Sequence, residues 1–352
     1  MFGLNISKFF FYKRKPKSIV KVKKLQNQSF NYELNYKLHK FGNKNSNKTF
    51  YVIRRNPGAG MFSNINFVIH HLFIAEKFNF IPVVDMENFP NYYNEKYKIY
   101  GTKNSWEYYF YPINNYKLRD VYLSKRVIIC GKGTNNNPYI TGYKKLPYNE
   151  AKYFKKYLKF KPHIVNHVER YTNNVFKNKK ILGVHFRGSD QKTATNHPYP
   201  PSINQIVFNV DQLIKKHKYD LIFLVTEENH YYDYLKKRYN EKLCSLDCFR
   251  SYDDIFKVYP RKNHRYKLGL ETLINTLLLS KVNHLIGNDS NMISSAISLS
   301  KKKLLFTKID NSRNSKNIFL AAFLWKLKSL LPKYLGGFDI KLFSTKTIFK
   351  KN

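Results

Sequence analysis

Apolar and polar residues alternate along the first part of the chain in a pattern typical of strands and helices that follow one another. TFYVIRR (49–55) and FIPVVD (80–85) are β-branched and aromatic runs that indicate strands. Between them, apolar positions from Phe62 to Phe78 recur at helical spacing. This order predicts a strand–helix–strand unit that opens a first domain, and RVIICG (126–131) predicts a further short strand.

The second half of the chain has a more regular pattern, which starts with the strand-like run ILGVHFR (181–187). Because strands joined by helices run parallel in one sheet, this pattern predicts a parallel, doubly wound α/β fold. The remaining predicted strands are 220–226, 283–289 and 302–306, and the predicted helices are 202–217, 230–239, 266–280 and 290–300.

The length of 352 residues favours two domains of ordinary size. We expect two Rossmann-like domains, at 49–178 and at 179–330. The first 48 residues alternate charged and aromatic residues without a clear period, so they are predicted as an arm or edge element (1–48). Residues 331–352 are predicted as a C-terminal tail.

The chain carries a formal charge of +40, from 63 Lys and Arg against 23 Asp and Glu. Such a charge raises encounter rates with phosphates and anionic lipid head groups. However, the excess of Lys, Asn, Tyr, Ile and Phe runs through every segment, which indicates a compositional bias more than a nucleic-acid surface. A non-enzymatic basic protein that binds polyanions stays open as an alternative, with nucleic acid not favoured as the partner.

The cysteines and the apolar runs of the sequence predict the cellular compartment of the protein. Cys130, Cys244 and Cys248 fit neither a disulfide framework nor a four-cysteine zinc site, so a reducing compartment is favoured. The start lacks the features of a signal peptide, and no run reaches the roughly 18 apolar residues of a spanning helix. We expect a cytoplasmic protein, in which the Phe- and Lys-rich segment 2–17 either contacts an anionic membrane or is a frayed basic tail.

Polar side chains follow the predicted strands of the second half. Ligands of parallel sheets bind at the carboxyl ends of the strands, which places Arg187, Thr226 and Asp289 at one edge. A guanidinium at Arg187 can grip phosphate oxygens with two hydrogen bonds, and Lys192 adds a second cation. Asp190 can orient either cation or a substrate hydroxyl. A surface salt bridge among solvated side chains is the alternative.

The next two strand ends offer groups for other parts of a nucleotide. Thr226, Glu227 and Glu228 offer a hydroxyl and carboxylates of the kind that accept a ribose hydroxyl or a base amino group. The alternative for the acids, and for Glu228 in particular, is that they only favour the dipole of the helix that begins there. Asn288, Asp289 and Ser290 precede a helix whose free backbone N–H groups form an anion site. An ordinary helix N-cap explains part of that cluster.

Two loops complete the candidate chemistry. Gly58 and Gly60 in the PGAG turn allow a ligand close to the backbone, but the motifs of nicotinamide dehydrogenases and P-loop kinases are absent from the sequence. His197 lies in the proline-stiffened loop TNHPYPP, where an imidazole could take a proton from an acceptor hydroxyl. An inert loop histidine is the alternative reading of His197.

Three segments together resemble a known family. GVHFRGSDQK, FLVTEEN and RYKLGLETLINTLLLSKVNHLIGNDSNMISSAISL, in this order, resemble the α1,6-fucosyltransferase and nodulation fucosyltransferase group. They also resemble the wider GDP-fucose superfamily of α1,2- and protein O-fucosyltransferases. His185, Arg187 and Asp190 match the H-x-R-x-x-D motif. The resemblance covers about residues 180–300 and, less closely, 50–86.

The resemblance implies a GT-B fold, in which two Rossmann-like domains with parallel sheets face a cleft and the C-terminal one binds GDP-fucose without a metal or cofactor. The N-terminal domain would then serve the acceptor. Arg187 would hold the β-phosphate, with Asp190 and Lys192 supporting the diphosphate loop. The implied donor-binding residues are Gly58, Gly60, His185, Lys192, Thr226, Glu227, Asn288, Asp289, Ser290, Ser294 and Ser295.

The chain departs from the α1,6 group at two positions. The family's paired arginines are Arg187–Gly188 here, and its catalytic glutamate has Thr195 as the nearest counterpart, so His197 or Asp190 is the expected base. The function expected is inverting transfer of fucose to a glycan hydroxyl, in bacterial surface-polysaccharide biosynthesis. A GT-B enzyme for another nucleotide sugar is the alternative within enzymes.

Overall fold

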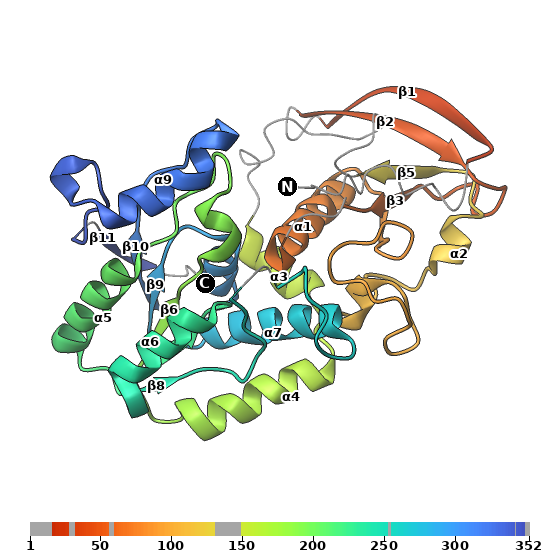
Figure 1. Cartoon of the computed structure of the whole chain (residues 1–352). Helices are drawn as coiled ribbons and strands as arrows, with labels where there is room; N and C mark the ends of the chain where they lie inside the picture. Colours follow the sequence, from red (N-terminus) through yellow and green to blue (C-terminus); the bar gives the residue numbers. More distant parts are fainter. Residues whose placement is uncertain are drawn as a thin grey trace. The chain divides into compact units, whose positions relative to one another are not determined.

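The computed structural model describes residues 16–27, 32–55, 60–130, 149–252, 255–341 and 343–348 (Figure 1). The chain forms two compact units. Unit 1 comprises Met1–Pro162 with Asn263–Gly269, and unit 2 comprises His163–Lys262 with Leu270–Asn352. The predicted domain boundaries at residues 48, 178 and 330 stay predictions.

Unit 1 is built on a five-stranded sheet with the order β1-β2-β5-β3-β4. The central strands are parallel, as the sequence predicts, and α1 joins β3 to β4. The sheet is not wholly parallel, however, because β1 and β2 form an antiparallel hairpin that pairs with β5. Their bounds are β1 Ser18–Asn27, β2 Tyr32–Lys40, β3 Phe50–Ile53, α1 Met61–Lys77, β4 Ile81–Val84 and β5 Val127–Cys130.

The shorter elements of unit 1 lie beyond β4. They are the 3-10 helix η2 (Ser105–Tyr108), α2 (Leu118–Val121) and α3 (Glu150–Tyr157), whose N-cap Asn149 accepts a hydrogen bond from the backbone N–H of Lys152. Helix α1 is buried along most of its length, which matches its apolar sequence.

Unit 2 is built on a six-stranded sheet with the order β11-β10-β9-β6-β7-β8. Five strands are parallel and β11 pairs antiparallel with β10, so residues predicted as a tail form the sheet edge. The predicted α/β fold is therefore confirmed, with antiparallel additions in both sheets. The strands are β6 Ile181–His185, β7 Leu221–Val225, β8 Leu243–Cys244, β9 His284–Gly287, β10 Leu304–Ile309 and β11 Phe343–Ile348.

Helices connect the strands of unit 2. A capping box starts α5, because the Ser202 hydroxyl accepts from the backbone of Gln205 while the Gln205 side chain accepts from the backbone of Ser202. The core behind β6 contains Leu182, Val184 and Phe186. The helices are α4 Pro162–Tyr171, the π-helix Thr172–Phe176, α5 Ile203–His217, α6 Asn229–Tyr239, α7 His264–Leu279, α8 Asn291–Leu299 and α9 Ile318–Leu330, with short 3-10 turns at Ser189–Lys192, Asn240–Lys242 and Lys333–Leu335. The first residues of α7, up to Gly269, are grouped with unit 1.

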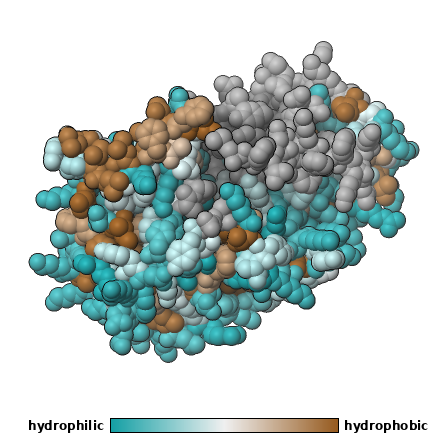
Figure 2. All heavy atoms as spheres, viewed as in Figure 1, coloured by the Kyte–Doolittle hydropathy of each residue, from teal (hydrophilic) through white to brown (hydrophobic). Residues whose placement is uncertain are grey.

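Helix α9 differs from the other helices of unit 2 in its surface. Apolar residues gather on the exterior over α9 (Figures 1 and 2), where Phe319 and Leu330 are exposed. No helix within the described ranges is long and apolar enough to span a bilayer.

Candidate functional site

The carboxyl ends of three adjacent parallel strands form the edge that the sequence singled out. Strand β6 lies between β9 and β7, with His185 paired to Val225 and Val184 paired to Ile286. The residues that follow these strands therefore leave the sheet at the same edge. This edge of unit 2 is called the strand-end site below, and it includes the segments after β6, β7 and β9.

Arg187 is paired with a carboxylate from the neighbouring strand end. Its Nε donates to Glu227 Oε1 at 3.1 Å. Both side chains are partly exposed, at 29% and 23%, so the pair adds only about 0–1 kcal/mol to stability. Its main effect is on geometry, because the carboxylate fixes the direction of the planar guanidinium.

Lys192 is held by a second carboxylate and by aromatic rings. Its Nζ donates to Glu228 at 2.9 Å, and the ammonium also lies 4.8 Å from the ring centre of Tyr231 and 5.0 Å from that of Trp325. His230 Nε2 approaches the same Glu228 oxygen at 2.9 Å. Glu228 is 5% exposed, and a carboxylate so buried requires such partners.

Gly188 allows this arrangement to form. A β-carbon at position 188 would lie 1.9 Å from Oε1 of Glu228 and 2.8 Å from Cε of Lys192. Those distances are far below van der Waals contact, so any side chain there would displace the carboxylate. The side chain of Lys192 thus occupies the space beside Gly188, the position where the α1,6 group has its second arginine.

The side chain of Thr226 forms a hydrogen bond within the turn that precedes α6. Its Oγ1 accepts from the backbone N–H of Glu228 at 3.3 Å, and the residue is buried. Behind the turn, Phe186 stacks on Tyr231 with ring centres 3.8 Å apart. The contact of Thr226 and Glu227 with guanosine stays a prediction, since both side chains have local partners here.

Two buried polar groups lie at the ends of β6 and β9. Asn288 donates from Nδ2 to Gln191 Oε1 at 3.3 Å, whereas its Oδ1 has no hydrogen-bond partner among the described residues. Within the same described ranges, Nδ1 of the buried His185 is also unsatisfied. Burial, with the charge of Arg187, lowers the pKa of His185 to about 3, so its imidazole is neutral at pH 7. A ligand is one source of the missing hydrogen bonds.

The remaining residues after β9 have mostly local roles. Ser290 is the N-cap of α8 and accepts from the backbone N–H of Ile293 at 3.2 Å. Asp289 is exposed and lies 3.6 Å from Lys308. Ser294 donates to a backbone carbonyl at 3.1 Å, and Ser295 is completely buried. Ser290 therefore acts as a helix N-cap, as one of the two sequence interpretations had it. Contacts of Asp289, Ser290, Ser294 and Ser295 with the nucleotide-sugar donor stay predictions.

The predicted base residues lie on the segment after β6. Asp190 belongs to the 3-10 turn Ser189–Lys192. His197 is exposed, and its carbonyl accepts from the backbone N–H of Asn314 at 2.8 Å. The backbone N–H of Asn196 donates to Ser315 at 3.0 Å, so the segment that leads into α9 holds this loop.

The glycine-rich turn belongs to unit 1. Gly58 lies outside the described residues, and Gly60 is the N-cap of α1. Among the described residues, nothing lies within 4 Å of a β-carbon placed on Gly60, so their packing does not require glycine there. Its contact with a donor stays a prediction.

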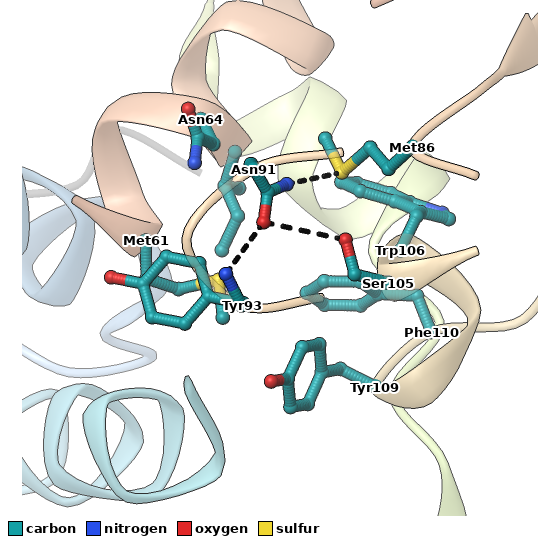
Figure 3. A pocket seen from close by; sticks show the side chains of 10 residues that line it. Met61, Asn64, Met86, Asn91, Tyr93, Ser105, Trp106, Tyr109 and Phe110 are labelled. Atoms are coloured by element: carbon teal, nitrogen blue, oxygen red, sulfur yellow. Dashed lines mark hydrogen bonds between the residues drawn. The ribbon is translucent and has the colours of Figure 1, made fainter. Parts of the chain in front are cut away.

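A small pocket of about 10 Å³ lies inside unit 1 (Figure 3). The side chain of Asn91 lines this pocket, and its Oδ1 accepts hydrogen bonds from the backbone N–H of Tyr93 at 2.8 Å and from Ser105 Oγ at 3.4 Å. That volume suits about one water molecule, which is too small for a sugar. Elsewhere in the described ranges, no three His, Cys, Asp or Glu side chains gather as the ligands of a metal would.

Three residues beside Lys192 were not assigned their observed contacts by the sequence analysis. For Glu228 the sequence offered a ribose or base contact or a helix-dipole role, and the structure pairs it with Lys192 and His230. His230 follows it by two positions. Trp325 carried no signal, because it is far from Lys192 in the chain and only folding brings the two together.

Comparison with known proteins supports the fold. No protein-family model and no curated protein sequence matches the chain. Among solved structures, NodZ α-1,6-fucosyltransferase soaked with GDP-fucose is similar, with a TM-score of 0.51, 14% identity, and coverage of 75% of this chain and 96% of that one. Arabidopsis thaliana FUT1 with GDP gives a TM-score of 0.43, 11% identity, and coverage of 79% and 77%. POFUT1 with GDP gives 0.41, 13% identity, and coverage of 72% and 95%.

The likeness to NodZ concerns the fold. The chain has a fucosyltransferase-like fold of the GT-B type, with two α/β units, as its motifs predicted.

Proposed function

We propose that the chain is a glycosyltransferase that moves fucose from GDP-fucose to a hydroxyl of a glycan. The observation that carries the proposal is the pair of cations at the strand-end site. Arg187 and Lys192 are each held by a glutamate from the adjacent strand end. The fold likeness to a fucosyltransferase soaked with GDP-fucose adds support.

The cations would act on the leaving group. When the bond between fucose C1 and the phosphate oxygen breaks, the diphosphate takes the electron pair and gains negative charge. A guanidinium oriented in advance stabilises that charge more than it stabilises the bound donor. Glu227 supplies this orientation, because it fixes Nε of Arg187. Lys192 would give a second positive charge, in place of the arginine that the α1,6 group has at position 188.

Neutral donors would surround the diphosphate. The amide of Asn288 and the first turn of α8 lie at the same sheet edge, and backbone N–H groups at a helix start favour anions. Among the described residues, Nδ1 of His185 is unsatisfied and would donate to a phosphate oxygen, whereas the unsatisfied Oδ1 of Asn288 is an acceptor and would take a hydroxyl of the ligand. Because His185 is neutral, it would contribute a hydrogen bond without adding charge. Asp289, Ser290, Ser294, Ser295 and Thr226 complete the proposed donor set of unit 2. Gly58 and Gly60 are proposed as further residues that contact the donor.

The proposed reaction inverts the configuration at fucose C1 in one displacement. The acceptor oxygen attacks C1 as GDP leaves, and a base takes the hydroxyl proton. His197 and Asp190 remain the proposed bases. His230 is a further candidate, because Glu228 holds its Nε2 at 2.9 Å in the manner of a carboxylate that orients a catalytic imidazole.

The biological setting is part of the proposal. A glycan of a bacterial surface polysaccharide is the proposed acceptor, with the reaction on the cytoplasmic side of a membrane and without a metal. Cell fractionation that recovers the chain outside the cytoplasm would refute this location. Transfer that stops in EDTA and returns with Mg²⁺ would refute the metal independence.

Calorimetric titration tests the donor. We expect heat of binding for GDP and GDP-fucose, with weaker binding of GDP-mannose and of UDP-sugars, and fucose-dependent release of GDP once an acceptor is present. Preference for another nucleotide sugar would instead support the other enzyme class. Binding to polyanions that ignores the sugar and falls steeply with salt would support the non-enzymatic alternative.

A further inference from the structure

Helix α9 presents an apolar stripe to the outside of unit 2 (Figure 2). Phe319, Phe323, Leu327 and Leu330 are 75%, 50%, 45% and 75% exposed. Their spacing of four, four and three residues places them on one face of the helix. A helix on a globular protein usually turns such a face toward the core, so the outward stripe of α9 requires an explanation.

The opposite face of α9 is firmly packed. Trp325 donates from Nε1 to the carbonyl of Pro200 at 2.8 Å, and Ala321 is completely buried. Asn314 donates to the carbonyl of Ala321 at 3.0 Å. The helix is therefore fixed with the stripe outward, and rotation that would hide the stripe would break these contacts.

The chain after α9 extends the same apolar surface. The exposed apolar residues beyond the helix are Tyr334, Leu335 and Ile340. The helix bears further exposed apolar side chains at its start, namely Ile318 and Leu320. Together with the stripe, these residues form what is called the α9 surface below.

Basic residues border the α9 surface. Residues 311–341 contain six Lys and Arg and one acidic residue, Asp339. Asp339 is neutralised by Lys333, whose Nζ lies 2.6 Å away. Lys316 and Lys326 are exposed beside the stripe. The surface thus combines protruding Phe and Leu side chains with a net positive charge.

We infer that the α9 surface docks on an anionic lipid bilayer, with α9 lying in the membrane interface. Phe and Leu side chains in a row insert among acyl chains, while flanking lysines reach phosphate head groups. A second copy of the chain is disfavoured as the occupant, since two copies of this face would bring like charges together, whereas an anionic bilayer would neutralise them. This inference stands independently of the proposed function.

Docking would bring the strand-end site close to the bilayer. Trp325, on the packed face of α9, lies 5.0 Å from the ammonium of Lys192. Asn314, just before the helix, donates to the carbonyl of Lys192 at 3.3 Å. The proposed donor site would therefore lie close to the bilayer, which suits an acceptor glycan carried on a lipid.

Vesicle sedimentation tests the docking with the full chain. We expect binding to vesicles of phosphatidylglycerol and phosphatidylcholine, and at least about tenfold weaker binding to pure phosphatidylcholine. Replacing both Phe323→Ser and Leu330→Ser should lower the affinity for the anionic vesicles by about tenfold or more, since two apolar insertions are lost.

The matched control is Tyr234→Ser, on the exposed face of α6 and 48% exposed. It should bind vesicles as the wild type does, and thermal unfolding should be alike in all variants. Unchanged binding of Phe323→Ser with Leu330→Ser would overturn the inference, because the bilayer would then contact another surface. A stable dimer without lipid that the double variant dissociates would overturn it in favour of a second copy.

Discussion

Oε1 of Glu228 lies where the side chain of residue 188 would begin, since a β-carbon on Gly188 would be 1.9 Å from it. Glu228 is buried and holds both Lys192 and His230. The absence of a side chain at position 188 therefore decides whether the cation and the imidazole keep their places. The Arg187–Gly188 sequence after β6 differs from the paired arginines of the α1,6 group. The carboxylate of Glu228 occupies the space that a side chain at position 188 would fill.

Gly188→Ala should destabilise the chain by about 1–3 kcal/mol, because the added methyl group collides with the buried carboxylate. In a background of Glu228→Ala the same substitution should cost much less, since the collision partner is removed. Urea unfolding of the four proteins of this double-mutant cycle measures the difference. Equal costs in both backgrounds would refute the contact.

Arg187→Ala should lower the rate of GDP-fucose turnover by on the order of a hundredfold, by analogy with the loss of one donor to a developing anion. Arg187→Lys should recover only part of the rate, because an ammonium cannot form two parallel hydrogen bonds. The measurement is release of GDP.

The control for this loss is Arg238→Ala, which removes another arginine of unit 2 that pairs with a carboxylate, Asp211, on an exposed surface. It should keep the wild-type rate. If Arg187→Ala and Arg238→Ala behave alike, the phosphate role of Arg187 is wrong.

Trp325 should report nucleotide binding by its fluorescence. The chain has two tryptophans, and Trp325 contacts the ammonium of Lys192, whereas Trp106 is buried in unit 1. Phosphates that draw Lys192 away would change the emission of Trp325. Titration with GDP should therefore change the tryptophan emission, after correction for absorption with free N-acetyltryptophanamide. The change should persist in the Trp106→Phe variant and disappear in the Trp325→Phe variant. The reverse pattern would contradict the proposed place of the diphosphate.

Stability should fall as the pH is lowered from 7 to 4. Burial lowers the pKa of His70 and His284 to about 4, and that of His71 and His185 to about 3. Between these values and about 6.5, the unfolded chain binds more protons than the native one, so the free energy of unfolding rises with pH. Each histidine adds at most about 1.4 kcal/mol per pH unit.

Urea unfolding at pH 5 and pH 7 checks this dependence. His284→Asn should flatten the slope, and the exposed His167→Asn serves as the matched control. A steeper slope in His284→Asn than in the wild type would show that the sign is wrong.

The sequence predicted the elements that carry the strand-end site because their residue patterns are local. The run that ends at His185 and the run that ends at Val225 are continuous apolar strands, and helical spacing marked the segments between them. The sequence left residues 1–48 as an arm or an edge element, and the structure forms the edge element, the β1–β2 pair. The sequence did not predict its pairing with β5, because that pairing depends on a segment far along the chain.

What the sequence determined by itself was which strands end in polar residues, and hence that Arg187, Thr226 and Asp289 share one edge. Backbone periodicity and the handedness of parallel connections suffice for that conclusion. Only the tertiary structure decided that Glu227 pairs with Arg187, that Glu228 joins Lys192 to His230, and that Trp325 contacts Lys192. The physical reason is that such pairings depend on distances between side chains from separate elements, and no local pattern of residues encodes those distances.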